Sequence, residues 1–291
     1  MNPHHRNGSA LAHDTAGTAG SGTPRRSAGR SSHTPRDERH GDRPGRPGTP
    51  PPVPGRLTFL YAFGGLGAAL FGLLTWQVAA NGPLLGPDRT VLHWFERTAA
   101  AHPRCDTTAH YFCKLGNIQV AVPVLVAAVI VVGFLGRRAR LPRWWLPPLA
   151  ASLAMAMVPA VVSAVKAAVL RPAPGKLHPG PDGYGYFPSG HTATSAVAYG
   201  LATLIVLPWV RRTAARVSLA AVTGAVLLAV GAALVWCDYH WPLDVLGSWC
   251  LTATVLSAVA VAQALSGQDP RPRGSRPVPV GPVSRSSGSP G

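Results

Sequence analysis

The sequence is poor in charged residues, and acidic residues are the scarcest of them. Only 13% of the 291 residues are Asp, Glu, Lys or Arg, whereas 47% are hydrophobic. A soluble domain usually carries about 25% charged residues. The composition therefore argues against a soluble protein and favours a membrane protein.

Cysteine is also scarce, and its spacing matches no metal-binding pattern. Cys105, Cys113, Cys237 and Cys250 form no Cys-x-x-Cys pair and lack the spacing of a zinc finger. We therefore expect structural thiols, no metal site and no other cofactor. A cleavable signal peptide is not expected either, because the first apolar run begins after about 55 polar residues and would serve as a membrane anchor.

Positive charge is in large excess, with 27 Lys and Arg against 11 Asp and Glu and a net charge of +16. Many arginines lie in the first 55 residues, and others directly follow apolar runs: Arg137, Arg138, Arg140, Arg143, Arg211, Arg212 and Arg216. This placement is typical of cytoplasmic segments beside membrane spans. We therefore expect membrane lipids as partners, and no nucleic acid.

The apolar residues divide the chain into three segments. Residues 1–55 and 267–291 are rich in Gly, Pro, Ser and Arg and lack apolar periodicity, so we predict disordered cytoplasmic tails. Residues 56–266 contain six apolar runs long enough to cross a bilayer, at about 57–80, 109–135, 144–170, 191–210, 217–236 and 243–265. The predicted fold is all-α, a six-transmembrane helical bundle.

A short amphipathic helix is predicted between the first two spans. Val91, Leu92, Trp94 and Phe95 lie there beside the charged residues Arg89, Glu96 and Arg97, a pattern typical of a helix lying at the membrane interface. An even number of spans returns both tails to one side. The protein is thus predicted to be a multi-pass cell membrane protein with both termini cytoplasmic, and the loops 81–106, 171–188 and 238–241 would be extracytoplasmic.

Polar residues gather at the span ends on that extracytoplasmic side. A charged group beside hydrocarbon is costly, so such residues point to function. They form three clusters: Lys166 with Arg171, then Ser189, Gly190 and His191, then His240 with Asp244. Lys166 on its own also fits a simpler interpretation, a side chain that extends towards the lipid headgroups.

The second and third clusters have a chemical rationale. Ser189 can cap a helix that begins after it, which leaves free N–H groups and a positive dipole end for an anion. His240 and Asp244 are four residues apart and would share one helix face. The carboxylate can then hold one imidazole nitrogen and leave the other nucleophilic.

From about residue 56 to 265 the chain resembles the type 2 phosphatidic acid phosphatase (PAP2) family. The family has three motifs in sequence order: Lys-x6-Arg-Pro, Pro-Ser-Gly-His and Ser-Arg-x5-His-x3-Asp. Residues 188–191 match the second motif in full, and residues 240–244 match the end of the third motif. The resemblance implies that His240 attacks phosphorus, that Asp244 orients it and that His191 protonates the leaving oxygen. It also implies that Ser189, Gly190 and Lys166 bind phosphoryl oxygens without a metal.

Two arginines of the family pattern are missing. Ala173 and Leu234 stand in their places, and Arg171 lies five residues after Lys166 instead of seven. On a straight helix that spacing rotates Arg171 about 140° from the lysine, so it would reach the same phosphate only if Pro172 ends the helix and the chain turns. Arg171 is the predicted substitute, with Lys176, His178 and Arg104 as other cations; Asp238 would repel phosphate if it faced the site.

The resemblance implies a metal-independent lipid phosphatase that acts through a phosphohistidine. Its substrate would be a lipid phosphate or diphosphate: a polyprenyl diphosphate, phosphatidic acid or phosphatidylglycerol phosphate. The bias towards Ala, Gly, Pro, Val and Arg is typical of high-GC bacteria and favours lipids of the cell envelope. Two alternatives stay open: a catalytically impaired relative that binds a lipid headgroup or a partner protein, and a transporter built on the same spans.

Overall fold

The structure is a computed structural model, and it describes residues 54–180 and 184–266. The predicted tails lie outside the described residues, apart from Pro54 and Gly55, with which the first helix begins. The described helices belong to one compact unit. They are α1 (Pro54–Ala79), α2 (Leu85–Ala101), η1 (Pro103–Cys105), α3 (Asp106–Leu115), α4 (Ile118–Arg138), α5 (Leu146–Val169), α6 (Gly190–Val206), η3 (Leu207–Trp209), α7 (Thr213–Trp236) and α8 (Pro242–Leu265).

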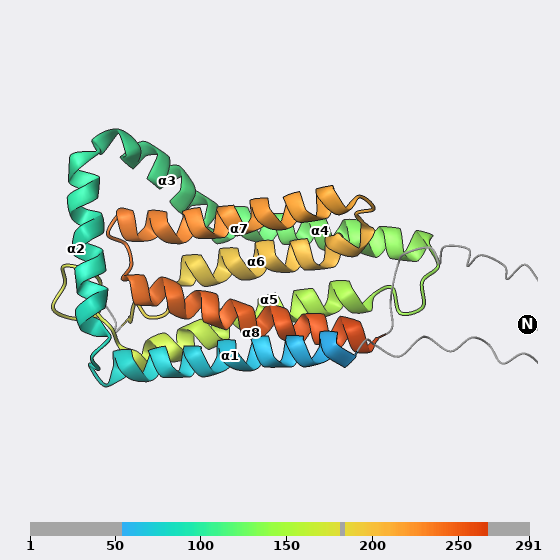
Figure 1. Ribbon diagram of the computed structural model, residues 1–291, viewed down its shortest axis with the longest axis horizontal. Coiled ribbons are helices and arrows are strands. Elements are labelled where there is room, and N and C mark those ends of the chain that lie inside the picture. Colours follow the sequence, from blue (N-terminus) through green and yellow to red (C-terminus); the bar gives the residue numbers. More distant parts are fainter. Residues whose placement is uncertain (1–53, 181–183, 267–291) are drawn as a thin grey trace, which may run out of the picture. The chain divides into compact units, whose positions relative to one another are not determined.

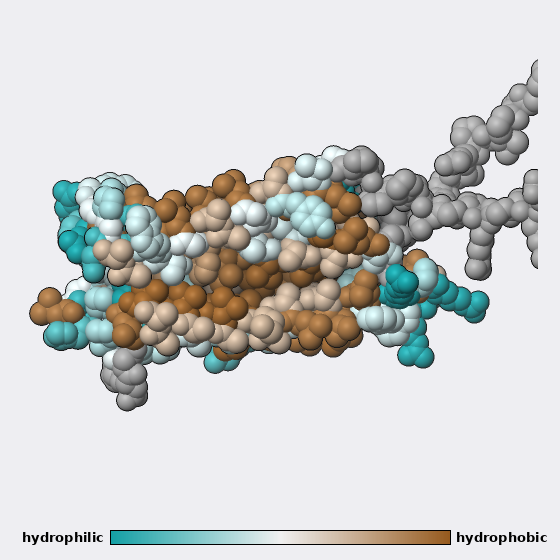
Figure 2. Space-filling model, turned by 90° about the horizontal axis from the view of Figure 1, so that it is seen from below, coloured by the Kyte–Doolittle hydropathy of each residue, from teal (hydrophilic) through white to brown (hydrophobic). Residues whose placement is uncertain are grey.

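Six helices of the described part are long and apolar enough to cross a membrane. They comprise residues Gly55–Ala79, Ile118–Arg138, Leu146–Val169, Gly190–Trp209, Thr213–Trp236 and Pro242–Leu265. The predicted all-α fold with six spans is therefore confirmed. Figure 2 shows the corresponding surface, a broad apolar band with hydrophilic residues gathered at its two ends.

The predicted second span was wrong at its start. The chain forms a separate helix α3 up to Leu115, and α4 begins only at Ile118. Asn117 has an extended backbone, with φ −68° and ψ 142°, which interrupts the helix. Asp106, His110 and Lys114 make α3 polar along one side, so only the residues after Asn117 form an apolar span.

The predicted amphipathic helix is present as α2, which is longer than its apolar residues suggested. Figure 1 shows α2 crossing the end of the bundle where α6 and α8 begin and where α5 and α7 end. The α4–α5 and α6–α7 connections, which carry the basic clusters, lie at the opposite end. The bundle thus separates a basic end from the end with the candidate site residues.

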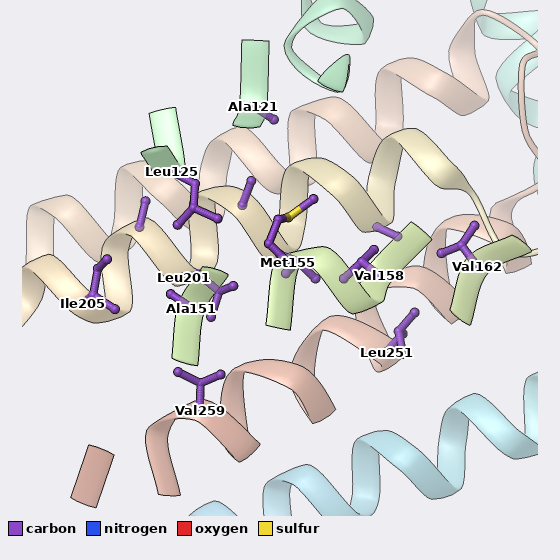
Figure 3. Close-up of a cluster of buried hydrophobic side chains, with 14 of the residues drawn as sticks. Ala121, Leu125, Ala151, Met155, Val158, Val162, Leu201, Ile205, Leu251 and Val259 are labelled. Carbon is purple, nitrogen blue, oxygen red and sulfur yellow. The ribbon is translucent and has the colours of Figure 1, made fainter. Parts of the chain in front are cut away.

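Helix α6 is the centre of the bundle and packs against α4, α5, α7 and α8. Its neighbours meet it in an apolar cluster that includes Leu125, Met155, Leu201 and Val259 (Figure 3). Small residues bring α1 against α8: a Cβ on Gly67 would lie 2.9 Å from the Cys250 carbonyl oxygen. Such close packing is typical of membrane helices, which associate through small residues.

Candidate active site

Ser189 begins α6 as its N-cap, as predicted. Its backbone is extended, and its Oγ accepts hydrogen bonds from the Thr192 N–H at 3.3 Å and from the Thr192 hydroxyl at 3.0 Å. Ser189 is fully buried, and the hydroxyl of Ser248 donates to its carbonyl oxygen. The Ser189 hydroxyl keeps its own hydrogen for another acceptor, because a hydroxyl can accept and donate at once.

His240 and Asp244 form the predicted pair, although not on one helix face. The Nδ1 of His240 is 3.1 Å from Oδ2 of Asp244, and both side chains are buried. Helix α8 begins only at Pro242, so Asp244 lies in its first turn and accepts the Trp241 N–H at 3.2 Å. A carboxylate can only accept, so Nδ1 carries the hydrogen and Nε2 keeps its lone pair.

Arg171 reaches this pair because α5 ends just before it. Leu170 has φ 51° and ψ 32°, a left-handed conformation, and turns the chain one residue before Arg171. The guanidinium then donates from Nη1 to Oδ1 of Asp244 at 2.6 Å and from Nη2 to Asp88. It also lies 4.8 Å from the ring centre of Trp241. Arg171 is thus buried between two carboxylates.

Asp88 is a site residue that the sequence analysis missed. It lies in the first turn of α2, is buried, and accepts the Leu243 N–H at 2.8 Å with Oδ1 while Oδ2 accepts from Arg171. Burial raises the pKa of the Asp88 carboxyl, and the Arg171 guanidinium opposes the rise. Asp88 therefore ties α2 to both Arg171 and the start of α8.

Lys166 does not extend towards the surface. Its side chain is buried, and Nζ donates to the Gly185 carbonyl oxygen at 3.0 Å. The ammonium also lies 4.2 Å from the ring centre of Tyr184 and 5.6 Å from that of Tyr186, whose ring centre is 5.8 Å from that of His240. The segment before α6 therefore covers Lys166 and holds it near His240, contrary to the simpler interpretation of this lysine.

His191 is exposed, and its side chain contacts Asn117, the residue just before helix α4. Its Nε2 is 2.9 Å from Oδ1 of Asn117. His240 and Lys166 lie within electrostatic range of its ring. Asn117 was also missed by the sequence analysis, because nothing in its local pattern distinguishes it.

The two positions at which the family resemblance predicts arginines are both buried. Leu234 is only 1% exposed and packs with Ala109, Cys113 and Val230, so it faces α3. Ala173 is 9% exposed. The other cations considered above, Lys176, His178 and Arg104, have exposed side chains.

Asp238 is exposed, with its charge beside Glu96 and His93 of α2. Partial burial of its carboxyl raises the pKa of Asp238, the charge of Glu96 raises it further, and His93 lowers it. The charged groups nearest to Asp238 in effect therefore belong to α2.

The family model of the PAP2 superfamily matches residues 147–267, the segment that contains every predicted site residue. Among solved structures, the chain is similar to the first transmembrane PAP2 type phosphatidylglycerolphosphate phosphatase from Bacillus subtilis. The identity is 18%, the TM-score is 0.55, and the match covers 70% of this chain and 93% of that chain. The likeness shows that the two share a fold. Among curated proteins, no sequence matches.

Proposed function

Because the family model of the PAP2 superfamily matches residues 147–267 of this chain, we propose that the protein hydrolyses a lipid phosphate or diphosphate in the membrane. The candidate substrates are a polyprenyl diphosphate, phosphatidic acid and phosphatidylglycerol phosphate. One observation carries the proposal: Asp244 holds Nδ1 of His240 at 3.1 Å, which leaves Nε2 as a nucleophile. A buried histidine with only a structural role would not need an unpaired Nε2 beside the N-terminus of a helix.

In the first step, the Nε2 lone pair of His240 attacks phosphorus, and the bond from phosphorus to the leaving oxygen breaks. His191 gives a proton to that oxygen, and a phosphohistidine forms. In the second step, water attacks phosphorus, His191 takes its proton, and the bond from phosphorus to nitrogen breaks. Free phosphate and the original histidines result. Asp244 stabilises the positive charge that His240 gains in the first step.

The phosphoryl oxygens would be held by the Ser189 hydroxyl, the Gly190 N–H and the Lys166 ammonium. The capped first turn of α6 supports this assignment, because its free N–H groups and dipole favour an anion. For Arg171, the contacts with Asp88 and Asp244 support a different role from the predicted direct clamp. It would orient Asp244 and supply positive charge from behind it.

The site would open to the extracytoplasmic side. The basic clusters of the α4–α5 and α6–α7 connections lie at the opposite end of the bundle, and positive residues favour the cytoplasm. Both termini of the helical domain would then be cytoplasmic, and the substrate would come from the outer leaflet.

The test is phosphate release by the purified full-length protein in detergent with chelator present, using the three candidate lipids. Wild type should release phosphate from at least one lipid, and His240→Ala should lose about a thousandfold or more of the rate. His178→Ala is the matched control, because His178 is exposed in the loop before α6. Release that persists unchanged in His240→Ala would exclude the proposed mechanism.

The alternative function, a catalytically impaired protein that binds a lipid headgroup or a partner protein, also has an observation in its favour. Leu234 offers no hydrogen-bond donor where the family has an arginine, and Arg171 is already paired with two carboxylates. Such a protein would be stabilised against heat by a lipid phosphate in wild type and in His240→Ala, and neither would release phosphate. Stabilisation without turnover would therefore select the alternative.

A further inference from the structure

Two cysteines from distant parts of the chain touch at the end of the bundle that carries the candidate site. Cys113 of α3 and Cys237, which follows α7, have their sulfur atoms 3.8 Å apart although they are separated by 124 positions in the sequence. Both are reduced in the structure. A disulfide has its sulfur atoms at about 2.05 Å, so its formation would require rotation of the two side chains to bring the sulfur atoms closer.

We propose that Cys113 and Cys237 are a disulfide-forming pair that links α3 to the turn carrying His240. The turn is short: the N–H groups of both Tyr239 and His240 donate to the Leu234 carbonyl oxygen. A disulfide at Cys237 would therefore restrain the chain three residues before His240, the proposed nucleophile. The inference does not depend on the proposed catalysis, because it rests on the contact between the two thiols.

The two thiols differ in solvent exposure, and this difference indicates which thiol reacts first with an external disulfide. Cys113 is 7% exposed, whereas Cys237 is partly exposed. The Nδ1–H of His110 donates to the Asp106 carbonyl oxygen and lies 3.8 Å from the Cys237 sulfur, where it can also stabilise a thiolate. Cys237 is thus the thiol that meets an external oxidant.

The oxidant is a disulfide supplied by another thiol compound or protein. The Cys237 thiolate attacks one sulfur of that disulfide, so a mixed disulfide forms and the first external thiol leaves. The Cys113 thiolate then attacks the Cys237 sulfur, so the internal disulfide forms and the second external thiol leaves. Two electrons pass to the external disulfide, and the two protons from the cysteines pass to the departing thiolates.

Burial raises the pKa of Cys113 to about 12, and the charge and hydrogen bond of the neighbouring Cys237 contribute to the rise. Burial also raises the pKa of the Cys237 thiol, whereas its hydrogen bond with Cys113 lowers it. The position also suits oxidation, because the basic clusters lie at the opposite end of the bundle, and extracytoplasmic thiols meet oxidising conditions.

The experiment uses the full chain with Cys105→Ser and Cys250→Ser, so that only this pair remains. Membranes are reduced, treated with oxidised glutathione, quenched with acid and labelled with a maleimide. We expect two labelled thiols per chain before oxidation, none afterwards, a monomer on a non-reducing gel, and one peptide pair joined through Cys113 and Cys237. Two labelled thiols after oxidation, or disulfide-linked dimers, would overturn the proposal.

Single variants in the same background test the order of exchange. Cys113→Ser should accumulate a glutathione adduct at Cys237, whereas Cys237→Ser should form about tenfold less adduct at the buried Cys113. Equal adducts would overturn the assigned order. The disulfide-linked peptide pair is measured in protein that keeps both Cys113 and Cys237. A single variant that fails to fold therefore does not affect that main test.

Discussion

Nη1 of Arg171 lies 2.6 Å from Oδ1 of Asp244, although the two residues are 73 positions apart in the sequence. The other oxygen of the same carboxylate accepts from His240 and from the Trp241 N–H. Asp244 therefore joins a buried cation to the proposed nucleophile. Both of its oxygens are engaged, so its orientation is fixed from two sides.

Replacement of Asp244 by Asn should reduce turnover far more than substrate binding. Asn lacks the charge that stabilises protonated His240, and its amide can present N–H to Nδ1, which would favour the wrong tautomer. We expect phosphate release to fall between about a hundredfold and ten-thousandfold, with little change in KM. Steady-state kinetics measure both. Asp238→Asn is the matched control, because Asp238 is exposed; an equal loss in that variant would contradict the assignment.

Two replacements of Asp88 should separate its hydrogen bond from its charge. Asn keeps an oxygen for the Leu243 N–H, whereas Ala leaves that buried donor and one side of Arg171 without a partner. We expect Asp88→Ala to lower the free energy of unfolding by about 1–3 kcal/mol relative to Asp88→Asn. Chemical denaturation in detergent measures the difference. Glu96→Gln in the same helix is exposed and should change stability by less than about 0.5 kcal/mol.

The pH dependence of stability should differ between wild type and Asp88→Asn. Burial raises the pKa of Asp88 above its usual 3.8, so the folded protein binds more protons than the unfolded chain between the two values. Wild type should therefore gain stability relative to Asp88→Asn as the pH falls through the raised pKa. Unfolding midpoints measured at several acidic pH values test this; a relative loss of stability would reverse the sign and exclude a raised pKa.

Local features of the site could be predicted from the sequence, and distant ones could not. Ser189 caps α6 because cap and helix are adjacent, and Asp244 meets His240 because they are four residues apart. The predicted pairing of His240 with Asp244 was right, although helix α8 begins only at Pro242. A carboxylate in the first turn of a helix can reach back to the residues before it.

The contacts of Asp88 and Asn117 had no such local signal. Asp88 meets Arg171 across 83 positions, and Asn117 meets His191 across 74. A single acidic or amide side chain in a polar segment is not part of a repeating pattern, so the sequence does not indicate its distant partner. The start of the second span was misplaced for a related reason: the apolar run hid the break at Asn117, which depends on backbone conformation.

Replacing Leu234 by the arginine that the family resemblance predicts should damage this protein instead of improving it. The side chain packs with Ala109, Cys113 and Val230, so an arginine would place an unpaired charge in an apolar cluster. We expect Leu234→Arg to lower the free energy of unfolding by about 3–5 kcal/mol without a gain in phosphate release. Leu234→Met keeps the volume and should cost less than about 1.5 kcal/mol. A folded Leu234→Arg protein with faster turnover would show that this position reaches the substrate.

Asn117 should affect turnover only through His191. Its Oδ1 accepts from Nε2 of His191, which fixes the ring and leaves the other nitrogen for proton transfer. Asn117→Ala should lower phosphate release about tenfold, whereas Gln119→Ala, an exposed amide in the same helix start, should not. If the residue acts through the histidine, Asn117→Ala will have no further effect once His191 is Ala, because coupled residues are not additive. Independent, multiplying losses would mean that Asn117 stabilises the protein or binds substrate by another route.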